Sequence, residues 1–279
     1  CDCDTCQRYK EEGKHRTRFS VLVENEGERV LIDASPDLRF QFLREGIDDI
    51  DSIIITHAHY DHYAGLGNLY RVIWDALPMY GAPDVLDSVL DEYAYLPFPR
   101  RQNVEPFEPF EVAGLEFTLV PVHHPPMETY GVVIRDPATG TKVVLSGDTS
   151  RYFDDDSFEA MREPDLLVAD AFVPADTTHN RFVADRISDD GLEFADKHMT
   201  YEVLLTLPTP LTQTRWRSSI SRTTLTTSTT NSPKTAIRTS SRAATKRKGL
   251  TRRTTTWSRC LPKPRPPPRN AKPISAGSR

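Results

Sequence analysis

The densest group of chemically capable side chains is one short segment, His-Ala-His-Tyr-Asp-His, which begins at His57. Imidazole and carboxylate groups are ligands for Zn²⁺ and Mn²⁺. A loop that leaves a strand can direct alternate side chains to opposite sides. His57 and His59 could then bind one metal ion, and Asp61 and His62 a neighbouring one. The alternative is a polar surface loop, but the chain has only 8 His, and three of them in one such loop by chance is not expected.

This segment resembles the hallmark His-x-His-x-Asp-His of the metallo-β-lactamase superfamily, and the resemblance covers roughly residues 1–205. It implies an α/β fold, the four-layer αββα sandwich of that superfamily. It also implies a ligand His in Pro-Val-His-His, which we assign to His124 rather than to its loop neighbour His123, and a bridging carboxylate in Gly-Asp-Thr, which is Asp148. The implied ligands of the first metal are His57, His59 and His124; those of the second are Asp61, His62 and a further His, with Asp148 between the two ions.

Two such ions, about 3.5–4 Å apart, can hold a bridging water, lower its pKa and stabilise the attacking and leaving oxygens. The sequence therefore predicts a hydrolase with two Zn (or Mn), most naturally acting on a phosphodiester. Asp61 is expected to take part in catalysis. His198, in Lys-His-Met-Thr, resembles a family residue that contacts phosphate or donates a proton to the leaving oxygen; the alternative is that this segment only starts a helix, capped by Thr200.

Three of the 4 Cys lie close together, at Cys1, Cys3 and Cys6. They predict a structural zinc site, with reduced surface thiols or a disulfide pair as alternatives. Together with Leu-Ile-Asp-Ala-Ser-Pro-Asp from Leu31 and Glu-Thr-Tyr-Gly from Glu128, they resemble the phosphoribosyl cyclic phosphodiesterase branch of the superfamily. That resemblance implies a cyclic or small phosphodiester substrate, and a first strand that is missing from this chain.

Other functions stay open within the same fold. One is a tRNA 3′-end nuclease; another is a hydrolase of thioesters or lactams, because lactamase-fold enzymes use similar ligands for different substrates. A nuclease would need a protruding, basic RNA-gripping arm. Residues 76–109 contain only Arg100 and Arg101 as basic residues, so nucleic acid is not the expected partner of this domain.

The elements that must position these side chains are short and alternate in type. Strands are expected over 19–24 and 29–33 as a hairpin, and over 52–56, 115–122, 129–135, 141–146 and 165–169. Helices are expected over 36–45 and 83–95, a loop leads into a helix over 57–68, and a Pro-rich connector covers 97–109. Because the candidate ligands follow strands, this order predicts a layered α/β domain over residues 1–205.

The charge changes abruptly near residue 207. Residues 208–279 hold 17 Lys and Arg and no Asp or Glu, so all 40 acidic residues lie before them. We expect residues 206–279 to be a basic Thr/Ser/Arg/Pro-rich tail without packed structure, since it lacks apolar periodicity. If this tail is a functional arm, its charge would give salt-sensitive binding to nucleic acid.

The resembled family has a His-x-x-His about 22 residues beyond His198, but no His follows that residue here. Asp codons read one base out of frame become Thr codons, and residues 219–224 permit codons that encode His-Leu-Ser-His-Tyr in another frame. We therefore hypothesise that the chain from about residue 203 is a frameshifted translation. An inactive, truncated homologue is the corresponding alternative for its function.

No run of apolar residues is long enough for a membrane span, and no secretory leader is visible. These features predict a cytoplasmic protein without a membrane partner. They leave the oligomeric state open, with a homodimer as one possibility.

Overall fold

The computed structural model describes residues 4–13, 17–171, 197–199, 215–218 and 223–226. The chain divides into two units, Cys1–Ser241 and Arg242–Arg279, and every described residue lies in the first.

Six strands form the first sheet, in the order β12-β1-β2-β3-β4-β5. β1 and β2 form an antiparallel hairpin through a turn in which Glu26 and Gly27 both have positive φ, the backbone that suits the twist of a hairpin. The strands from β2 to β5 run parallel, so β2 and β3 end at the same edge of the sheet. The bounds are β1 Val21–Asn25, β2 Glu28–Ile32, β3 Ser52–Ile54, β4 Leu77–Gly81, β5 Pro99–Asn103 and β12 Thr223–Thr226.

The second sheet also has six strands, in the order β11-β10-β9-β8-β7-β6. β8 is antiparallel to both β7 and β9, and β10 is parallel to β9. β7, β9 and β10 therefore point the same way and end at one edge. The bounds are β6 Phe110–Val112, β7 Leu115–Val122, β8 Thr129–Arg135, β9 Lys142–Leu145, β10 Leu166–Ala169 and β11 Arg215–Ser218.

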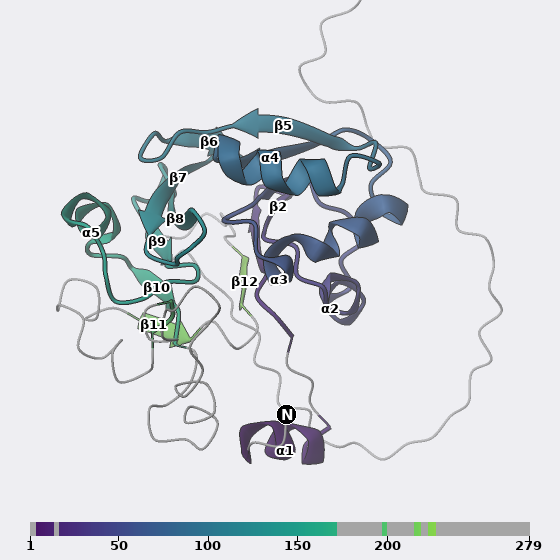
Figure 1. Ribbon diagram of the computed structural model, residues 1–279, viewed down its shortest axis with the longest axis horizontal. Coiled ribbons are helices and arrows are strands. Elements are labelled where there is room, and N and C mark those ends of the chain that lie inside the picture. Colours follow the sequence, from purple (N-terminus) through teal and green to yellow (C-terminus); the bar gives the residue numbers. More distant parts are fainter. Residues whose placement is uncertain (1–3, 14–16, 172–196, 200–214, 219–222, 227–279) are drawn as a thin grey trace, which may run out of the picture. The chain divides into compact units, whose positions relative to one another are not determined.

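Helices flank the two sheets (Figure 1). α4 packs on β4 and β5 of the first sheet, and α5 packs on β7 of the second. The sequence sets their ends: α2 stops at Gly46, which has φ 69, and the Asp154 side chain caps the start of α5. Among the described helices, none is long and apolar enough to span a membrane. The bounds are α1 Asp4–Glu11, α2 Leu38–Glu45, α3 Tyr60–Tyr63, the 3₁₀-helix η1 Ala64–Arg71, α4 Pro83–Glu92 and α5 Asp155–Met161.

The predicted α/β metallo-β-lactamase fold is confirmed by this pair of sheets with flanking helices. One hydrophobic cluster joins side chains of both sheets, including the fully buried Ile53 and Phe117. A second cluster lies under α5 and includes Met161 and Met199. Burying a side chain of this size contributes about 1.5–3 kcal/mol. Met199 thereby anchors the segment that carries His198 to the second sheet.

The structure contains elements that the sequence-based expectation did not include: α1, β4, β5, β6 and α5, and the two strands β11 and β12. β5 lies inside the segment expected to be a Pro-rich connector, and nearly all its residues are exposed. It is the edge strand of its sheet, and edge strands are often polar and carry Pro, so they lack the alternating pattern that reveals a strand. β4 lies inside the sheet but contains Pro78, a residue that is uncommon in central strands because it cannot donate a backbone hydrogen bond. The predicted helix over 83–95 exists but ends at Glu92.

Two short strands occur in the segment for which the sequence predicted no packed structure. β11 pairs parallel with β10, and β12 pairs parallel with β1. A sheet edge offers backbone N–H and C=O groups to any extended segment, so an apolar pattern is not required there. The remainder of the predicted tail, residues 206–279, lies outside the described residues.

Candidate metal centre

The candidate ligands lie just after the ends of strands in both sheets. Asp33 follows β2 and the His57 segment follows β3, while His124, Asp148 and Asp170 follow β7, β9 and β10. The backbone N–H of Tyr130 donates to the carbonyl of Thr56 at 3.2 Å. This bond ties β8 of the second sheet to the segment that leaves β3, so the two ligand-bearing edges meet.

Three imidazoles converge first. His57 Nε2 lies 3.1 Å from His59 Nδ1, and His124 Nε2 lies 3.0 Å from that same atom. The other ring nitrogen of His124, Nδ1, donates to the carbonyl oxygen of Lys197 at 2.8 Å. Because a carbonyl only accepts, His124 carries its proton on Nδ1 and turns an electron pair on Nε2 toward the other two rings.

A second group of candidate ligands, formed by Asp61, His62 and Asp148, adjoins these three imidazoles. His62 Nε2 lies 3.1 Å from Asp148 Oδ2 and 3.9 Å from Asp61 Oδ2. The centroids of the His57 and His62 rings are 4.1 Å apart. His62 is buried, whereas the Asp61 side chain is 52% exposed, so this group opens to solvent on the Asp61 side.

Asp33, a fully buried carboxylate, orients both groups. Its Oδ2 accepts hydrogen bonds from Thr56 Oγ1 and His62 Nδ1, each at 2.7 Å. Thr56 Oγ1 also lies 3.0 Å from His57 Nδ1. Since the hydroxyl gives its hydrogen to Asp33, it accepts one from His57 Nδ1. His57 and His62 thus both present Nε2 to the centre, the arrangement in which a carboxylate or hydroxyl fixes a metal-binding imidazole.

The histidines of the two groups differ in the direction in which their pKa values are shifted. Burial lowers the pKa of His57 well below its usual value, lowers that of His59, and lowers the pKa of His124 to about 4. These three imidazoles are therefore neutral near pH 7, which is the form that binds metals. Burial also acts to lower the pKa of His62, but Asp148 and Asp33 raise it well above the usual value. The two carboxylates thus create a strongly negative environment that suits a cation.

His198 lies against the first group, with its ring centroid 4.7 Å from that of His124. Its Nδ1 donates to Asp170 Oδ2 at 2.8 Å, and the backbone N–H of Thr149 donates to the same oxygen at 3.2 Å. Burial raises the pKa of Asp170 to about 6. Burial acts to lower the pKa of His198, but the hydrogen bond and charge of Asp170 raise it. Asp170 therefore favours the protonated form of His198.

The donor set fits divalent metal ions. A tetrahedral zinc ion with Zn–N bonds of about 2.0–2.1 Å separates its nitrogen ligands by about 3.4 Å, close to the 3.0–3.1 Å between the imidazoles of the first group. Mixed imidazole and carboxylate ligands suit Zn²⁺ or Mn²⁺ better than Ca²⁺. In the described part of the chain, four sets of three such side chains have ligand atoms within 4.8 Å of one another: His57, His59 and His124; Asp33, His57 and His62; His124, Asp148 and His198; and Asp61, His62 and Asp148.

The structure thus brings together every predicted catalytic-site residue: His57, His59, Asp61, His62, His124, Asp148 and His198. Sequence reasoning missed Asp33, Thr56 and Asp170 as parts of the site. Asp33 is the last residue of one predicted strand and Asp170 directly follows another, and this position at a strand end could have identified them. Of the predicted structural zinc ligands, Cys1 and Cys3 lie outside the described residues, and Cys6 is described only by its place in α1. Thr200, the alternative cap, also lies outside them.

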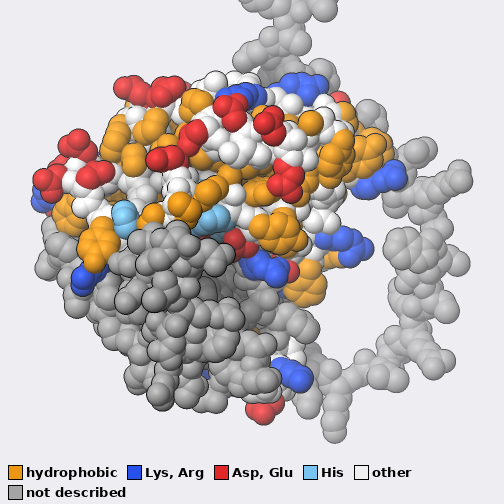
Figure 2. Space-filling model, in the orientation of Figure 1, with side chains coloured by type: hydrophobic (Ala, Val, Ile, Leu, Met, Phe, Trp, Pro, Cys, Tyr) orange, Lys and Arg blue, Asp and Glu red, His pale blue; other side chains and the backbone are white. Residues whose placement is uncertain are grey.

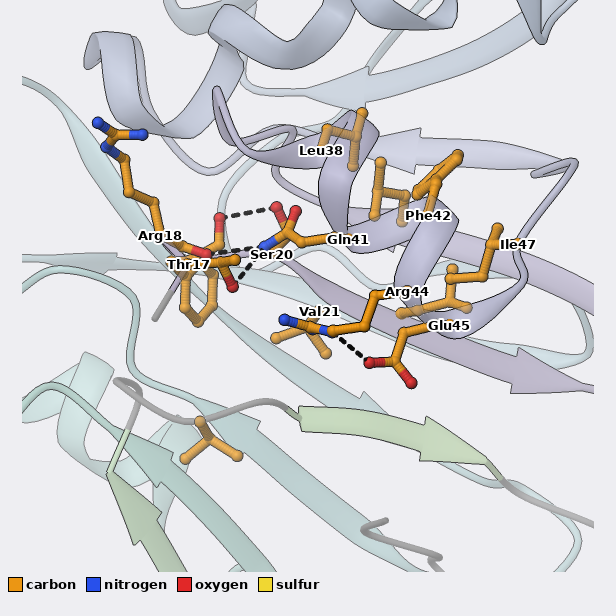
Figure 3. Close-up of a pocket in the computed structure, with 14 residues that line it drawn as sticks. Thr17, Arg18, Ser20, Val21, Leu38, Gln41, Phe42, Arg44, Glu45 and Ile47 are labelled. Carbon is orange, nitrogen blue, oxygen red and sulfur yellow. Dashed lines mark hydrogen bonds and ion pairs between the residues drawn. The ribbon is translucent and has the colours of Figure 1, made fainter. Parts of the chain in front are cut away.

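A separate cavity lies between α2 and β1, and its lining includes none of the candidate metal ligands (Figure 3). Gln41 of α2 donates to Thr17 Oγ1 at 3.2 Å and to the Arg18 carbonyl at 2.9 Å. Arg44 forms an ion pair with Glu45 at 2.6 Å. Apolar side chains line the rest of the cavity, among them Val21, Leu38 and Phe42. None of the candidate ligands lines it, so the metal centre and this cavity are distinct features.

The chain belongs to the β-lactamase superfamily, because the family model for the beta-lactamase superfamily domain matches residues 28–248. An octanoyltransferase of Porphyromonas gingivalis is 36% identical over 149 residues, 50% of this chain and 30% of that protein. A ribonuclease Z of Bradyrhizobium diazoefficiens is 30% identical over 137 residues, 44% of this chain and 46% of that protein. The chain therefore spans less than half the length of these curated relatives.

Among solved structures, the chain is similar to a diphosphatase from the PhnP family. The TM-score is 0.62 at 26% sequence identity, and the match covers 79% of this chain and 80% of that one.

The comparisons give no support to the hypothesis of a frameshift. The family match continues to residue 248, well beyond residue 203, from which the hypothesis expects unrelated sequence.

Proposed function

We propose that this protein is a metal-dependent hydrolase that cleaves a small or cyclic phosphodiester. The observation that carries the proposal is the convergence of neutral imidazoles and buried carboxylates from five strand ends, with a hydrogen-bonded acid, His198, beside them. The similar diphosphatase and ribonuclease Z are both named for cleaving phosphate linkages, which supports phosphorus as the reacting centre.

His57, His59 and His124 would hold one cation, and Asp61 and His62 a second. Asp148 belongs to ligand sets on both sides, so it would contact both cations. Bound Zn²⁺ or Mn²⁺ would supply Lewis acidity and activate water. Asp33 fixes the orientation of two of these imidazoles through its bonds to Thr56 and His62.

The remaining chemistry is proton transfer to the leaving oxygen. Asp170 holds Nδ1 of His198, which leaves the Nε2 proton directed away from the carboxylate. A positioned acid of this kind contributes about 10²–10⁴-fold to a rate. His198 would therefore protonate the departing alkoxide, with Asp170 as its positioning residue.

The test uses the full chain, stripped with a chelator and reloaded with Zn²⁺ or Mn²⁺, and bis(p-nitrophenyl) phosphate as substrate. We expect His124→Ala to lose bound metal and hydrolysis together. We expect His198→Ala to keep its metal while hydrolysis falls about 10²–10⁴-fold. Asp48→Asn is the control, because this side chain is 91% exposed and outside the site. Cleavage of a thioester or lactam in place of the phosphodiester would contradict the proposal, as would no hydrolysis by the reloaded wild type.

A ribonuclease is the second candidate, favoured by the similarity to ribonuclease Z. Residues 76–109 argue against it, because they build β4, α4 and β5 of the first sheet. Arg101 is paired with Asp87, and Arg100 donates to the carbonyls of Pro97 and Pro99. Cleavage of a 3′-extended tRNA with a higher kcat/KM than a small phosphodiester would favour the nuclease.

A further inference from the structure

The cavity between α2 and β1 lies where β1 begins, and side chains of both sheets line it. Its volume is about 50 Å³. A single water needs about 10–15 Å³, so the cavity has room for a molecule of the size of acetate or propionate. The apolar part of its lining includes Val21, Leu22, Leu31, Leu38, Phe42 and Val168.

Gln41 and Arg18, two polar residues of the cavity wall, already have partners. Gln41 donates to Thr17 Oγ1 and to the Arg18 carbonyl, and it accepts a hydrogen bond from Ser35 Oγ at 3.1 Å. The Arg18 guanidinium pairs with Asp37 at 3.0 Å. This part of the wall is therefore a closed hydrogen-bond network that does not depend on a ligand.

Arg44 is the group of the wall with unused donors. Its Nε donates to Glu45 Oε1 at 2.6 Å, and its guanidinium carbon lies 5.7 Å from the centroid of the Phe40 ring. Figure 3 shows this side chain reaching from α2 toward Val21. Among the residues that the structure describes, none accepts a hydrogen bond from Nη1 or Nη2, and Nη1 is buried. A buried, charged N–H without an acceptor is unfavourable, so this wall suits a ligand that supplies one.

Charge and shape define the class of ligand. Glu45 offsets part of the charge of Arg44, so the site favours a single negative charge over a dianion such as phosphate. A carboxylate matches the geometry of the two terminal guanidinium nitrogens. The apolar side chains of the lining suit a short alkyl group, which gains by leaving water.

The surface around the cavity does not attract carboxylates in general. All 40 acidic residues precede residue 208, and Figure 2 shows clusters of Asp and Glu side chains on the upper part of the visible face. Such a surface repels anions. A saturable response of this protein to a carboxylate therefore indicates a defined site rather than non-specific attraction.

We propose that the cavity between α2 and β1 binds a short aliphatic monocarboxylate, with propionate as the model ligand. The carboxylate accepts hydrogen bonds from the terminal nitrogens of Arg44, and the alkyl group packs against apolar side chains such as Leu38 and Phe42. None of the candidate metal ligands lines the cavity. The site is therefore independent of the function proposed above.

The first test follows the Tm of the full chain at constant ionic strength while propionate is added. We expect a saturable rise for the wild type. Arg44→Met should weaken the apparent affinity about 10–100-fold, because Met keeps an apolar stem but has no charge and no donor. Arg39→Met makes the same change at an exposed position of α2 and should respond like the wild type. Propionate that binds to metal ions would raise the Tm of every variant alike, so the difference between variants reports on the cavity.

The second test separates the cavity from the guanidinium itself. Ile47 is a partly buried residue of the lining, and Ile47→Phe fills the cavity without changing Arg44. We expect this variant to lose the response to propionate. If it responds like the wild type, the carboxylate binds to Arg44 outside the cavity, and the proposal is wrong.

The third test varies the ligand and uses the wild type alone, so it does not depend on how a variant folds. Propionamide, a neutral analogue of the same shape, should bind about tenfold more weakly than propionate. Propionate should bind about fourfold more tightly than acetate, because one more methylene is buried. Hexanoate and octanoate should not differ, since their last carbons lie outside the cavity. No saturable response of the wild type, or equal responses of wild type and Arg44→Met, would overturn the site.

Discussion

Asp33 shows how one buried side chain can set the geometry of a whole centre. It contacts no solvent, yet it holds His62 directly and His57 through Thr56. Its backbone has φ 59, an uncommon conformation for a residue other than Gly. A bond from Asp33 N to the Ile54 carbonyl at 2.9 Å helps to hold this conformation. Asp33 therefore fixes the orientation of two candidate ligand imidazoles.

We expect Asp33→Asn to weaken metal affinity and hydrolysis by about 10–100-fold, as loss of such an orienting group commonly does. The Asn amide is neutral. It can keep one of these hydrogen bonds, but it does not offer Thr56 and His62 a single, fully charged oxygen as their common acceptor. Metal content by mass spectrometry after dialysis, together with kcat/KM, measures the effect. Asp51→Asn is a matched control, because its carboxylate accepts a bond from Arg29 N outside the site. Equal behaviour of the two variants would contradict the orienting role.

At the level of elements, the start of η1 lies close to the segment that follows β2. This contact holds Asp33 next to the His57 segment. Gly65 N donates to the Ala34 carbonyl at 2.8 Å, and Ala34 N donates to the His62 carbonyl at 2.6 Å. A Cβ atom at Gly65 would lie 2.1 Å from Ser35 O and 2.9 Å from Ala34 O. Backbone cannot move aside as a flexible side chain can, so only Gly permits this contact.

We therefore expect Gly65→Ala to lower the free energy of unfolding by about 3 kcal/mol, the upper part of the range for overpacking. Gly67→Ala, in the same 3₁₀-helix, is the matched control, because its Cβ would meet nothing nearer than Tyr95 Oη at 3.4 Å. Urea unfolding of both variants provides the measurement. If Gly67→Ala destabilises the protein as much as Gly65→Ala, the loss comes from the helix itself rather than from the close approach.

The positions of the elements show where sequence reasoning succeeded and where it did not. Central strands such as β3 and β9 are buried along their whole length, so their apolar runs identified them. The edge strand β5 is mostly exposed, and its pairing with β4 depends on backbone groups that the sequence pattern does not encode. The loops that carry the candidate ligands lie where the sequence predicted them, because they follow the central strands.

At the scale of the whole molecule, one buried cation contributes to the pH dependence of stability. Lys142 of β9 is 6% exposed, and its Nζ donates to the Arg162 carbonyl at the end of α5. Burial lowers the pKa of Lys142 from 10.5 to about 8. Between these values the unfolded chain binds more protons than the folded one, so stability rises with pH. Burial also raises the pKa of Tyr63 and Tyr130 to about 12, which makes stability fall above the usual tyrosine pKa of 10.0.

We expect the free energy of unfolding to gain about 1–2 kcal/mol from this lysine between about pH 7.5 and about pH 9.5. Lys142→Met should remove that gain, because Met does not titrate. Lys10→Met, at an exposed position of α1, should retain it. Denaturant unfolding at the two pH values checks the prediction. A Lys142→Met variant with the pH dependence of the wild type would show that other groups produce the gain.

The sequence by itself determined the family resemblance, the central strands and the ligand-type residues, because these depend on spacing within short segments. Only the tertiary structure decided which of them meet. His59 and His124 are 65 residues apart in the chain, and His62 and Asp148 are 86 apart. Their contact depends on parallel strands from two sheets that end at facing edges, and on Asp33, which turns two imidazoles inward. The partners of Asp33 and Asp170 are set by packing and buried hydrogen bonds between distant segments, and no local pattern records such contacts.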